Sequence, residues 1–204
     1  METLSLCVGT RPGAHEKKRR IRRRIKQLGP RCVVLFEDET DILLFPPLGA
    51  AWSRRGQPAP VVLSGRNARR VVFGTISLTT GHRVLWVSHR QRAEDFQAFL
   101  HVLQGHYRGW SVVLLLDRDS SHTAKASQEV ARELGMELLW LPLRSPELNA
   151  MDHLWRDAKK LVCANRQYAD IDDQAKRFVT YLQGLSPHQA MRKAGMLSKH
   201  FWLK

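Results

Sequence analysis

The stretch SVVLLLDRD, residues 111–119, combines an unbroken apolar run with an abrupt acidic end at Asp117. A short run of Val and Leu favours a strand that is buried on both faces, at the centre of a sheet covered by helices. The stretch CVVLFEDETDI, which begins at residue 32, has the same form and turns acidic at Asp38. If these two strands are neighbours, their carboxylates lie side by side at the carboxyl ends of the strands, where functional groups of α/β sheets gather.

The segments around these two strands alternate between strand and helix patterns. Their order predicts the α/β class, with a mixed central sheet flanked by helices. At 204 residues the chain is long enough for one domain with a substantial core. Periodicity and Gly or Pro breaks predict a hairpin over 70–89, helices over 93–107 and 121–135, a strand over 136–142, and helices from 149 to about 166 and on toward the C-terminus.

The charge of the chain is strongly positive and unevenly distributed. Lys and Arg number 33 against 19 Asp and Glu, a net charge of +14, which favours nucleic acid or an anionic membrane as partner. Half of this excess lies in HEKKRRIRRRIKQL, residues 15–28, where Ile21, Ile25 and Leu28 form a thin apolar stripe at helical spacing. We expect a basic segment over 1–30 that contacts DNA phosphates, with a solvated helix as the alternative. Its candidate contacts are Lys17, Lys18, Arg19, Arg20, Arg22, Arg23, Arg24 and Lys26.

The cysteines and the apolar runs limit the class of protein. Cys7, Cys32 and Cys163 are far apart and form no C-x-x-C motif, which argues against a disulfide framework and a structural zinc site. The longest apolar runs have strand length and are too short to span a membrane. The sequence therefore predicts a cytoplasmic protein with no membrane partner.

A third acidic residue, Asp152, joins Asp38 and Asp117 as a candidate for the same site. Asp152 lies in SPELNAMDHLW, residues 145–155, at the start of the helix that follows the strand over 136–142. Three clustered carboxylates repel one another unless a cation neutralises them, and hard oxygen ligands suit Mg²⁺ or Mn²⁺. Two such ions roughly 3.5–4 Å apart can stabilise both the attacking and the leaving oxygen of a phosphodiester.

Three blocks, FEDETDI, LDRDSSHTA and LPLRSPELNAMDHLW, resemble the catalytic blocks of the DDE/D transposases of the mariner superfamily, in its bacterial insertion-sequence branch. The segment PPLGAAWSRRGQ also resembles that family, and so does the spacing of 34 residues between Asp117 and Asp152. The resemblance covers about residues 31–165. It implies an RNase H-like fold over 31–204 and metal-dependent DNA cleavage and strand transfer, with Asp38, Asp117 and Asp152 holding two Mg²⁺ (or Mn²⁺) ions.

The same resemblance implies further expectations. His122 matches a family histidine, and we expect it either to position the site or to bond the helix start, while Asn149 caps the third block's helix and positions it. Arg54 and Arg55 are candidate DNA contacts. We expect a homodimer when the protein is active, and association with the nucleoid when it binds DNA. About thirty residues precede the first strand, too few for the family's helix-turn-helix modules. A truncated, inactive DNA-binding remnant is therefore the alternative function.

Several residues near the three blocks have simpler interpretations. We expect Glu37 and Glu39 to be solvated residues at a strand end, on the face opposite Asp38. We expect Asp119 to cap the next helix and Trp155 to anchor the core, with base stacking as the alternative for Trp155. Arg118, where the family carries a small amide, could pair with a carboxylate or contact phosphate.

Overall fold

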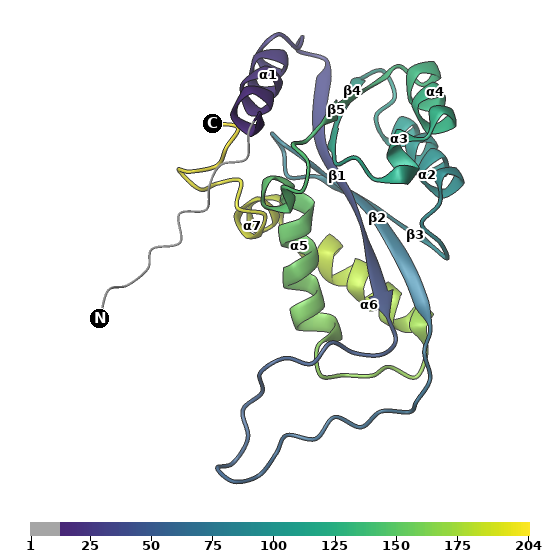
Figure 1. Cartoon of the computed structure of the whole chain (residues 1–204), viewed down its shortest axis with the longest axis vertical. Helices are drawn as coiled ribbons and strands as arrows, with labels where there is room; N and C mark the ends of the chain where they lie inside the picture. The colour runs from purple at the N-terminus through teal and green to yellow at the C-terminus, as the bar shows by residue number, and fades with distance from the viewer. Residues whose placement is uncertain (1–12) are drawn as a thin grey trace.

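The computed structural model describes residues 13–204, and a five-stranded mixed sheet forms the centre of this part of the chain (Figure 1). Cys7 and residues 1–12 of the predicted basic segment lie outside the described residues. In the strand order β3-β2-β1-β4-β5, β2 is antiparallel to both of its neighbours, whereas β1, β4 and β5 run parallel. The predicted α/β class and mixed sheet are confirmed. The strands are β1 (Cys32–Leu43), β2 (Arg69–Ser77), β3 (Arg83–Ser88), β4 (Ser111–Leu116) and β5 (Met136–Trp140).

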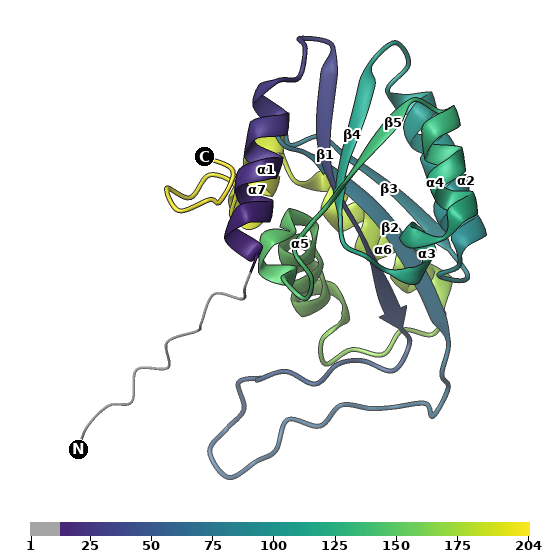
Figure 2. The ribbon, with the colours of Figure 1, turned by 45° about the horizontal axis from the view of Figure 1, so that its top comes forward.

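Helices cover both faces of this sheet (Figures 1 and 2). One face carries α1 (Ala14–Lys26), α5 (Ala150–Ala158), α6 (Ile171–Gly184) and α7 (Pro187–Lys193). The other face carries α2 (Ala93–His106), α3 (Ser120–Thr123) and α4 (Lys125–Glu133). Because side chains alternate along a strand, Val34 and Phe36 of β1 pack into the first core, and Val33 and Leu35 pack into the second.

The first strand is longer than its sequence pattern predicted. β1 does not end at Asp38 but continues to Leu43, because β2 pairs with it antiparallel as far as Leu43↔Arg69. Asp38 therefore lies in the middle of a strand, opposite Gly74 of β2. The hairpin predicted over 70–89 is confirmed as β2 and β3.

Two predicted helices are interrupted. The helix predicted over 121–135 is divided into α3 and α4 at Ala124, whose backbone is extended, with φ −54° and ψ 135°. The helix predicted from 149 to about 166 begins as α5 and continues beyond Ala158 as a π-helical turn over Lys159–Cys163. Neither interruption carries a Pro, and hydrophobic periodicity alone gives no signal for them.

Gly74 allows α5 to approach the sheet closely. A Cβ at this position would lie 2.5 Å from Cη2 of Trp155 and 2.8 Å from both Met151 Cε and Leu85 Cδ2. The Trp155 ring is buried and stacks on Phe178, with ring centroids 5.9 Å apart. Trp155 is thus the core anchor that the sequence predicted.

Both α1 and the C-terminal segment pack against the face that carries α5 (Figure 2). Ile21 is the buried residue of α1, and Arg24 forms an ion pair with Glu137 of β5 at 2.6 Å. The ring nitrogen of Trp202 donates a hydrogen bond to the carbonyl of Leu148, 2.9 Å away, just before α5. Among residues 13–204, no helix is long and apolar enough to cross a membrane.

Candidate active site

The register of two parallel strands places two of the predicted carboxylates side by side. β1 and β4 pair from Cys32↔Ser111 to Phe36↔Leu115, so the predicted neighbourhood of these strands is confirmed. Asp38 and Asp117 each follow the last of these pairs by two residues, and the charge of Asp117 acts on Asp38. β4 ends at Leu116, so Asp117 lies directly beyond the carboxyl end of its strand.

The third carboxylate lies in the first turn of α5, and Asn149 fixes the start of that helix. Asn149 Oδ1 accepts a hydrogen bond from the Met151 amide at 3.1 Å, which is the predicted N-cap. Asn149 Nδ2 donates to the carbonyl of Glu37 at 2.8 Å and so ties the helix start to β1. Asp152 forms an ion pair with Arg156, 2.9 Å away on the next turn of α5. Asn149 therefore positions α5 against the strand that carries Asp38.

Asp38 is partly buried and lies near other acidic side chains. Burial raises the pKa of Asp38 well above its usual value, and the nearby charges of Glu39, Asp117 and Asp152 raise it further. Asp152 keeps 30% of its side chain exposed and Asp117 keeps 59%. Solvent or a ligand can therefore reach the side chains of Asp117 and Asp152.

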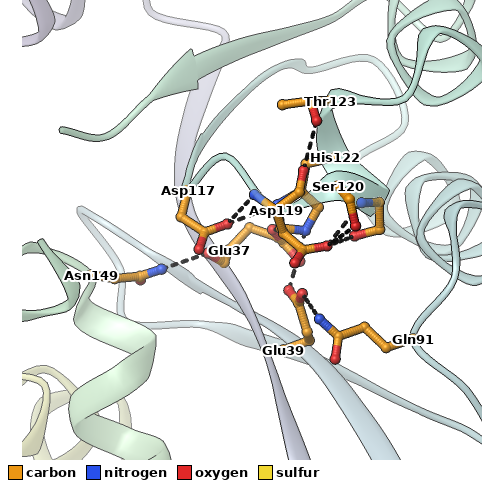
Figure 3. A network of polar contacts seen from close by, with 10 residues as sticks. Glu37, Glu39, Gln91, Asp117, Asp119, Ser120, His122, Thr123 and Asn149 are labelled. Atoms are coloured by element: carbon orange, nitrogen blue, oxygen red, sulfur yellow. Dashed lines mark hydrogen bonds and ion pairs between the residues drawn. The ribbon is translucent and has the colours of Figure 1, made fainter. Parts of the chain in front are cut away.

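A second group of charged side chains, Glu37, Glu39 and His122, contacts Asp117 on the face of the sheet that carries α2 (Figure 3). His122 Nε2 lies 3.2 Å from Glu39 Oε2 and 3.5 Å from Glu37 Oε2, and its Nδ1 lies 3.1 Å from Asp117 Oδ1. The exposed fractions of the Glu37, Glu39 and His122 side chains are 0%, 6% and 1%. The prediction that Glu37 and Glu39 are solvated is therefore wrong. Phe96 covers this group, with its ring centroid 4.5 Å from that of His122.

The sequence carried a signal for this burial. Glu37 and Glu39 alternate with Val33 and Leu35 on one face of β1, and that face is apolar. A charged residue that continues an apolar face is covered if the facing helix extends far enough, and here α2 and α3 do so. Of the two roles expected for His122, its contact with Asp117 favours positioning.

Burial and neighbouring charges shift the pKa values of this group in opposite directions. Burial disfavours the charged form of His122, but Glu37, Asp117 and Glu39 outweigh that effect and raise its pKa well above the usual value. Burial likewise raises the pKa of Glu37. The hydrogen bond from His122 lowers the pKa of Asp117 and keeps that carboxylate ionised.

Two residues next to Asp117 have separate roles. Asp119 caps α3, because its side chain accepts a hydrogen bond from the Ser121 amide at 2.8 Å, as predicted. The guanidinium carbon of Arg118 lies 5.9 Å from the ring centroid of Trp140, a cation–π contact that neither predicted role included.

The predicted DNA contacts occupy two surfaces. Arg54 and Arg55 are exposed in the long connection between β1 and β2. Two members of the basic helix already have partners, since Arg24 pairs with Glu137 and Arg22 donates to the carbonyl of Trp202. The candidates on α1 are Lys17, Lys18, Arg19, Arg20, Arg22, Arg23, Arg24 and Lys26.

Two sets of side chains could hold a metal ion. Glu37, Glu39 and His122 have ligand atoms within 4.8 Å of one another, but both ring nitrogens of His122 already face carboxylates. The three aspartates offer hard oxygen donors that repel one another, and two of them are open to a ligand. The chemistry of the donors therefore favours the aspartates as the divalent-cation site.

Comparison with solved structures establishes the fold. The crystal structure of the catalytic domain of Mos1 mariner transposase superimposes with a TM-score of 0.63 at 16% identity, over 92% of this chain and 87% of that one. The Mos1 transposase paired-end complex with left transposon end gives a TM-score of 0.70 at 18% identity, over 98% of this chain and 64% of that one. The predicted RNase H-like fold is confirmed.

Comparison with curated sequences identifies relatives that are longer than this chain. The insertion element IS630 uncharacterized 39 kDa protein of Shigella sonnei is 26% identical over 178 residues, 86% of this chain and 52% of the relative. The transposable element Tcb2 transposase of Caenorhabditis briggsae is 26% identical over 162 residues, 68% of this chain and 57% of the relative. The chain thus spans about half the length of these relatives. A family model for DDE superfamily endonucleases matches residues 33–189, most of the chain, and the protein therefore belongs to the DDE superfamily endonucleases.

Proposed function

We propose that this protein cuts and joins DNA in transposition, with Asp38, Asp117 and Asp152 as its catalytic carboxylates. The observation that supports the proposal is the position of Asp117 directly beyond β4, next to the strand that carries Asp38, with Asp117 and Asp152 both near enough to act on the charge of Asp38. The family and the IS630 and Tcb2 relatives support the reaction class.

We assign two Mg²⁺ or Mn²⁺ ions to these carboxylates. Mos1 transposase structures have been solved with Mg and with Mn, which supports the choice of ion. Such a metal pair activates a water or a DNA 3′-hydroxyl and stabilises the leaving oxygen. The protein's own task is to hold three carboxylates against their mutual repulsion. Asp38 lies within β1 opposite Gly74 of β2, and Asn149 ties the start of the helix that carries Asp152 to the Glu37 carbonyl of the same strand.

Positive charge beside the site supports DNA as the partner. The Lys and Arg residues of α1 other than Arg22 and Arg24, which already have protein partners, would contact phosphates, and Arg54 and Arg55 offer a second basic surface in the β1–β2 connection. We also propose that two copies act together, because cutting both ends of an element requires two active sites.

Nicking of supercoiled DNA in the presence of Mg²⁺ tests the catalytic assignment. We expect Asp38→Ala, Asp117→Ala and Asp152→Ala each to abolish nicking, whereas Asp119→Asn keeps its helix cap and retains nicking. Undiminished nicking by Asp152→Ala would remove that residue from the site. DNA binding with no metal-dependent product in the wild type would instead establish the inactive remnant.

The salt dependence of DNA affinity tests the role of α1. Each lost phosphate contact should reduce the slope of log K against log[salt] by about 0.9 for duplex DNA. We expect Arg20→Gln and Arg23→Gln to reduce the slope. Arg24→Gln should reduce it less, because Arg24 is already paired with Glu137. Unchanged slopes in all three variants would show that DNA does not bind along this helix.

A further inference from the structure

We propose that Gln91, Glu39 and His122 form a positioning chain that fixes the orientation of the Asp117 carboxylate for metal binding. This inference rests on the proposed function and extends the positioning role of His122 to Glu39 and Gln91. None of the three is assigned as a metal ligand.

The chain links four separate segments by direct contacts (Figure 3). Gln91, in the connection between β3 and α2, donates its side-chain amide to Glu39 Oε1. The other oxygen of Glu39 lies 3.2 Å from His122 Nε2. His122 Nδ1 lies 3.1 Å from Asp117 Oδ1, which also accepts the Asp119 amide at 2.9 Å. Two donors therefore hold Oδ1, and Oδ2 is the oxygen that we assign to the ion.

The environment of the chain makes it rigid. His122 is 1% exposed, and Phe96 packs against its ring, so the imidazole has little freedom to turn. Glu39 is 6% exposed, and Gln91 fixes one of its oxygens. Asp117 itself is 59% exposed and follows the last residue of β4. An exposed carboxylate in a loop keeps one rotamer only if a buried partner holds it.

The same contacts argue against a separate metal ion among Glu37, Glu39 and His122. A histidine ligand needs a ring nitrogen with a free lone pair, and both nitrogens of His122 face carboxylate oxygens within 3.2 Å. His122 Nε2 instead lies between the two glutamates, 3.5 Å from Glu37 Oε2 and 3.2 Å from Glu39 Oε2. These residues therefore act on metal binding through Asp117.

Residues that orient a ligand typically change metal affinity about 10–100-fold when they are replaced. We expect Gln91→Ala and Glu39→Gln each to weaken Mn²⁺ binding about 10-fold or more. Because the damage is to ligand orientation, saturating Mn²⁺ should restore most of the nicking rate. The half-saturating Mn²⁺ concentration should rise while the maximal rate changes little.

The experiment is titration of the purified full chain with Mn²⁺, followed by electron paramagnetic resonance of the free ion, beside the nicking assay. The matched control is Gln97→Ala, another half-buried glutamine, whose amide donates to Ser127 at 3.4 Å away from the chain. It should bind Mn²⁺ as the wild type does. Thermal melts of all variants show whether each one is folded.

The outcomes distinguish failure of the positioning chain from failure of the nuclease function on which it rests. Wild-type Mn²⁺ affinity in both Gln91→Ala and Glu39→Gln overturns the positioning chain, and so does an equal loss in Gln97→Ala. Loss of one bound Mn²⁺ equivalent in Glu37→Gln overturns it in favour of a buried metal site. If the wild type nicks no DNA but Gln91→Ala and Glu39→Gln still weaken Mn²⁺ binding, the positioning chain is supported and the proposed nuclease function is refuted. A wild type that binds no Mn²⁺ refutes both.

Discussion

Replacing Gly74 with Ala tests whether the close approach of α5 to the sheet sets the geometry of the site. The new Cβ would lie 2.5 Å from the Trp155 ring, about 1 Å inside an ordinary carbon–carbon contact of about 3.5 Å. Met151 Cε and Leu85 Cδ2 would each lie 2.8 Å from the new Cβ, so the methyl group cannot move toward either of them. The ring and its helix must therefore shift by about 1 Å.

Two effects of different size follow from that shift. Overpacking of a core costs about 1–3 kcal/mol, which for a chain of this length corresponds to a fall in Tm of roughly 2–12 °C. Asp152 lies one turn before Trp155 on α5, so the third carboxylate moves with the ring. A misplacement of about 1 Å can reduce a rate about 100-fold. We therefore expect a large loss of nicking rate in a protein that still melts cooperatively.

Thermal melts and metal-dependent nicking measure the two effects. The control is Gly105→Ala in α2, where nothing lies within 4 Å of the added Cβ and alanine should add up to about 1 kcal/mol of stability. Trp155→Phe in the Gly74→Ala background should restore part of the rate by returning space. If Gly74→Ala matched Gly105→Ala in both Tm and rate, the argument from close packing would be wrong.

Three further predictions concern charge and capping. Asp38→Asn should raise the stability of the metal-free protein by about 1 kcal/mol and abolish stabilisation by Mg²⁺. Because the folded-state pKa of Asp38 lies above its usual 3.8, ionisation favours unfolding, and the advantage of Asp38→Asn in thermal melts should grow as pH rises through that raised pKa. Asn149→Ala should lower the free energy of unfolding in urea by about 2 kcal/mol or more, because it removes a cap and the donor to the Glu37 carbonyl, and Asn149→Ser should lose less. Burial opposes ionisation of Asp157, but its hydrogen bond from Lys193 at 2.8 Å helps to lower its pKa below 3.8. The stability difference between wild type and Lys193→Met should therefore persist at neutral pH and close as pH falls through that lowered pKa; a constant difference would contradict the pairing.

Much of the fold followed from hydrophobic runs and their acidic ends. The Val and Leu runs before Asp38 and Asp117 predicted two central strands, and alternation placed Asp38 on the side of Phe36. Apolar runs and side-chain alternation depend on neighbouring residues in the sequence, and both are found unchanged in the folded sheet. Asn149 was found in the same way, because a helix cap depends on residues within one turn.

The parts that sequence could not supply depend on contacts between distant segments. β1 continues past Asp38 because β2 pairs with it, and a run of acidic residues gives no sign of that partner. Alternation with Val33 and Leu35 indicates which face of β1 carries Glu37 and Glu39, but the cover of α2 and α3 and the contact with His122, more than 80 residues away in sequence, appear only in the folded protein. Composition near one strand carries no information about a cation from another element.

The helix α5 contributes Asp152 to the site and also Met151, Leu154 and Trp155 to the core, where they are 0%, 0% and 3% exposed. This double contribution limits how a gene of this kind can decay. A premature stop codon before α5 removes the third proposed carboxylate together with α5, α6 and α7, the helices that share one face of the sheet with α1. Such a truncation therefore couples loss of cutting to loss of folding. A descendant that stays folded without cutting DNA is expected to arise from a substitution that leaves α5 on the sheet, at a carboxylate or at a close contact such as Gly74.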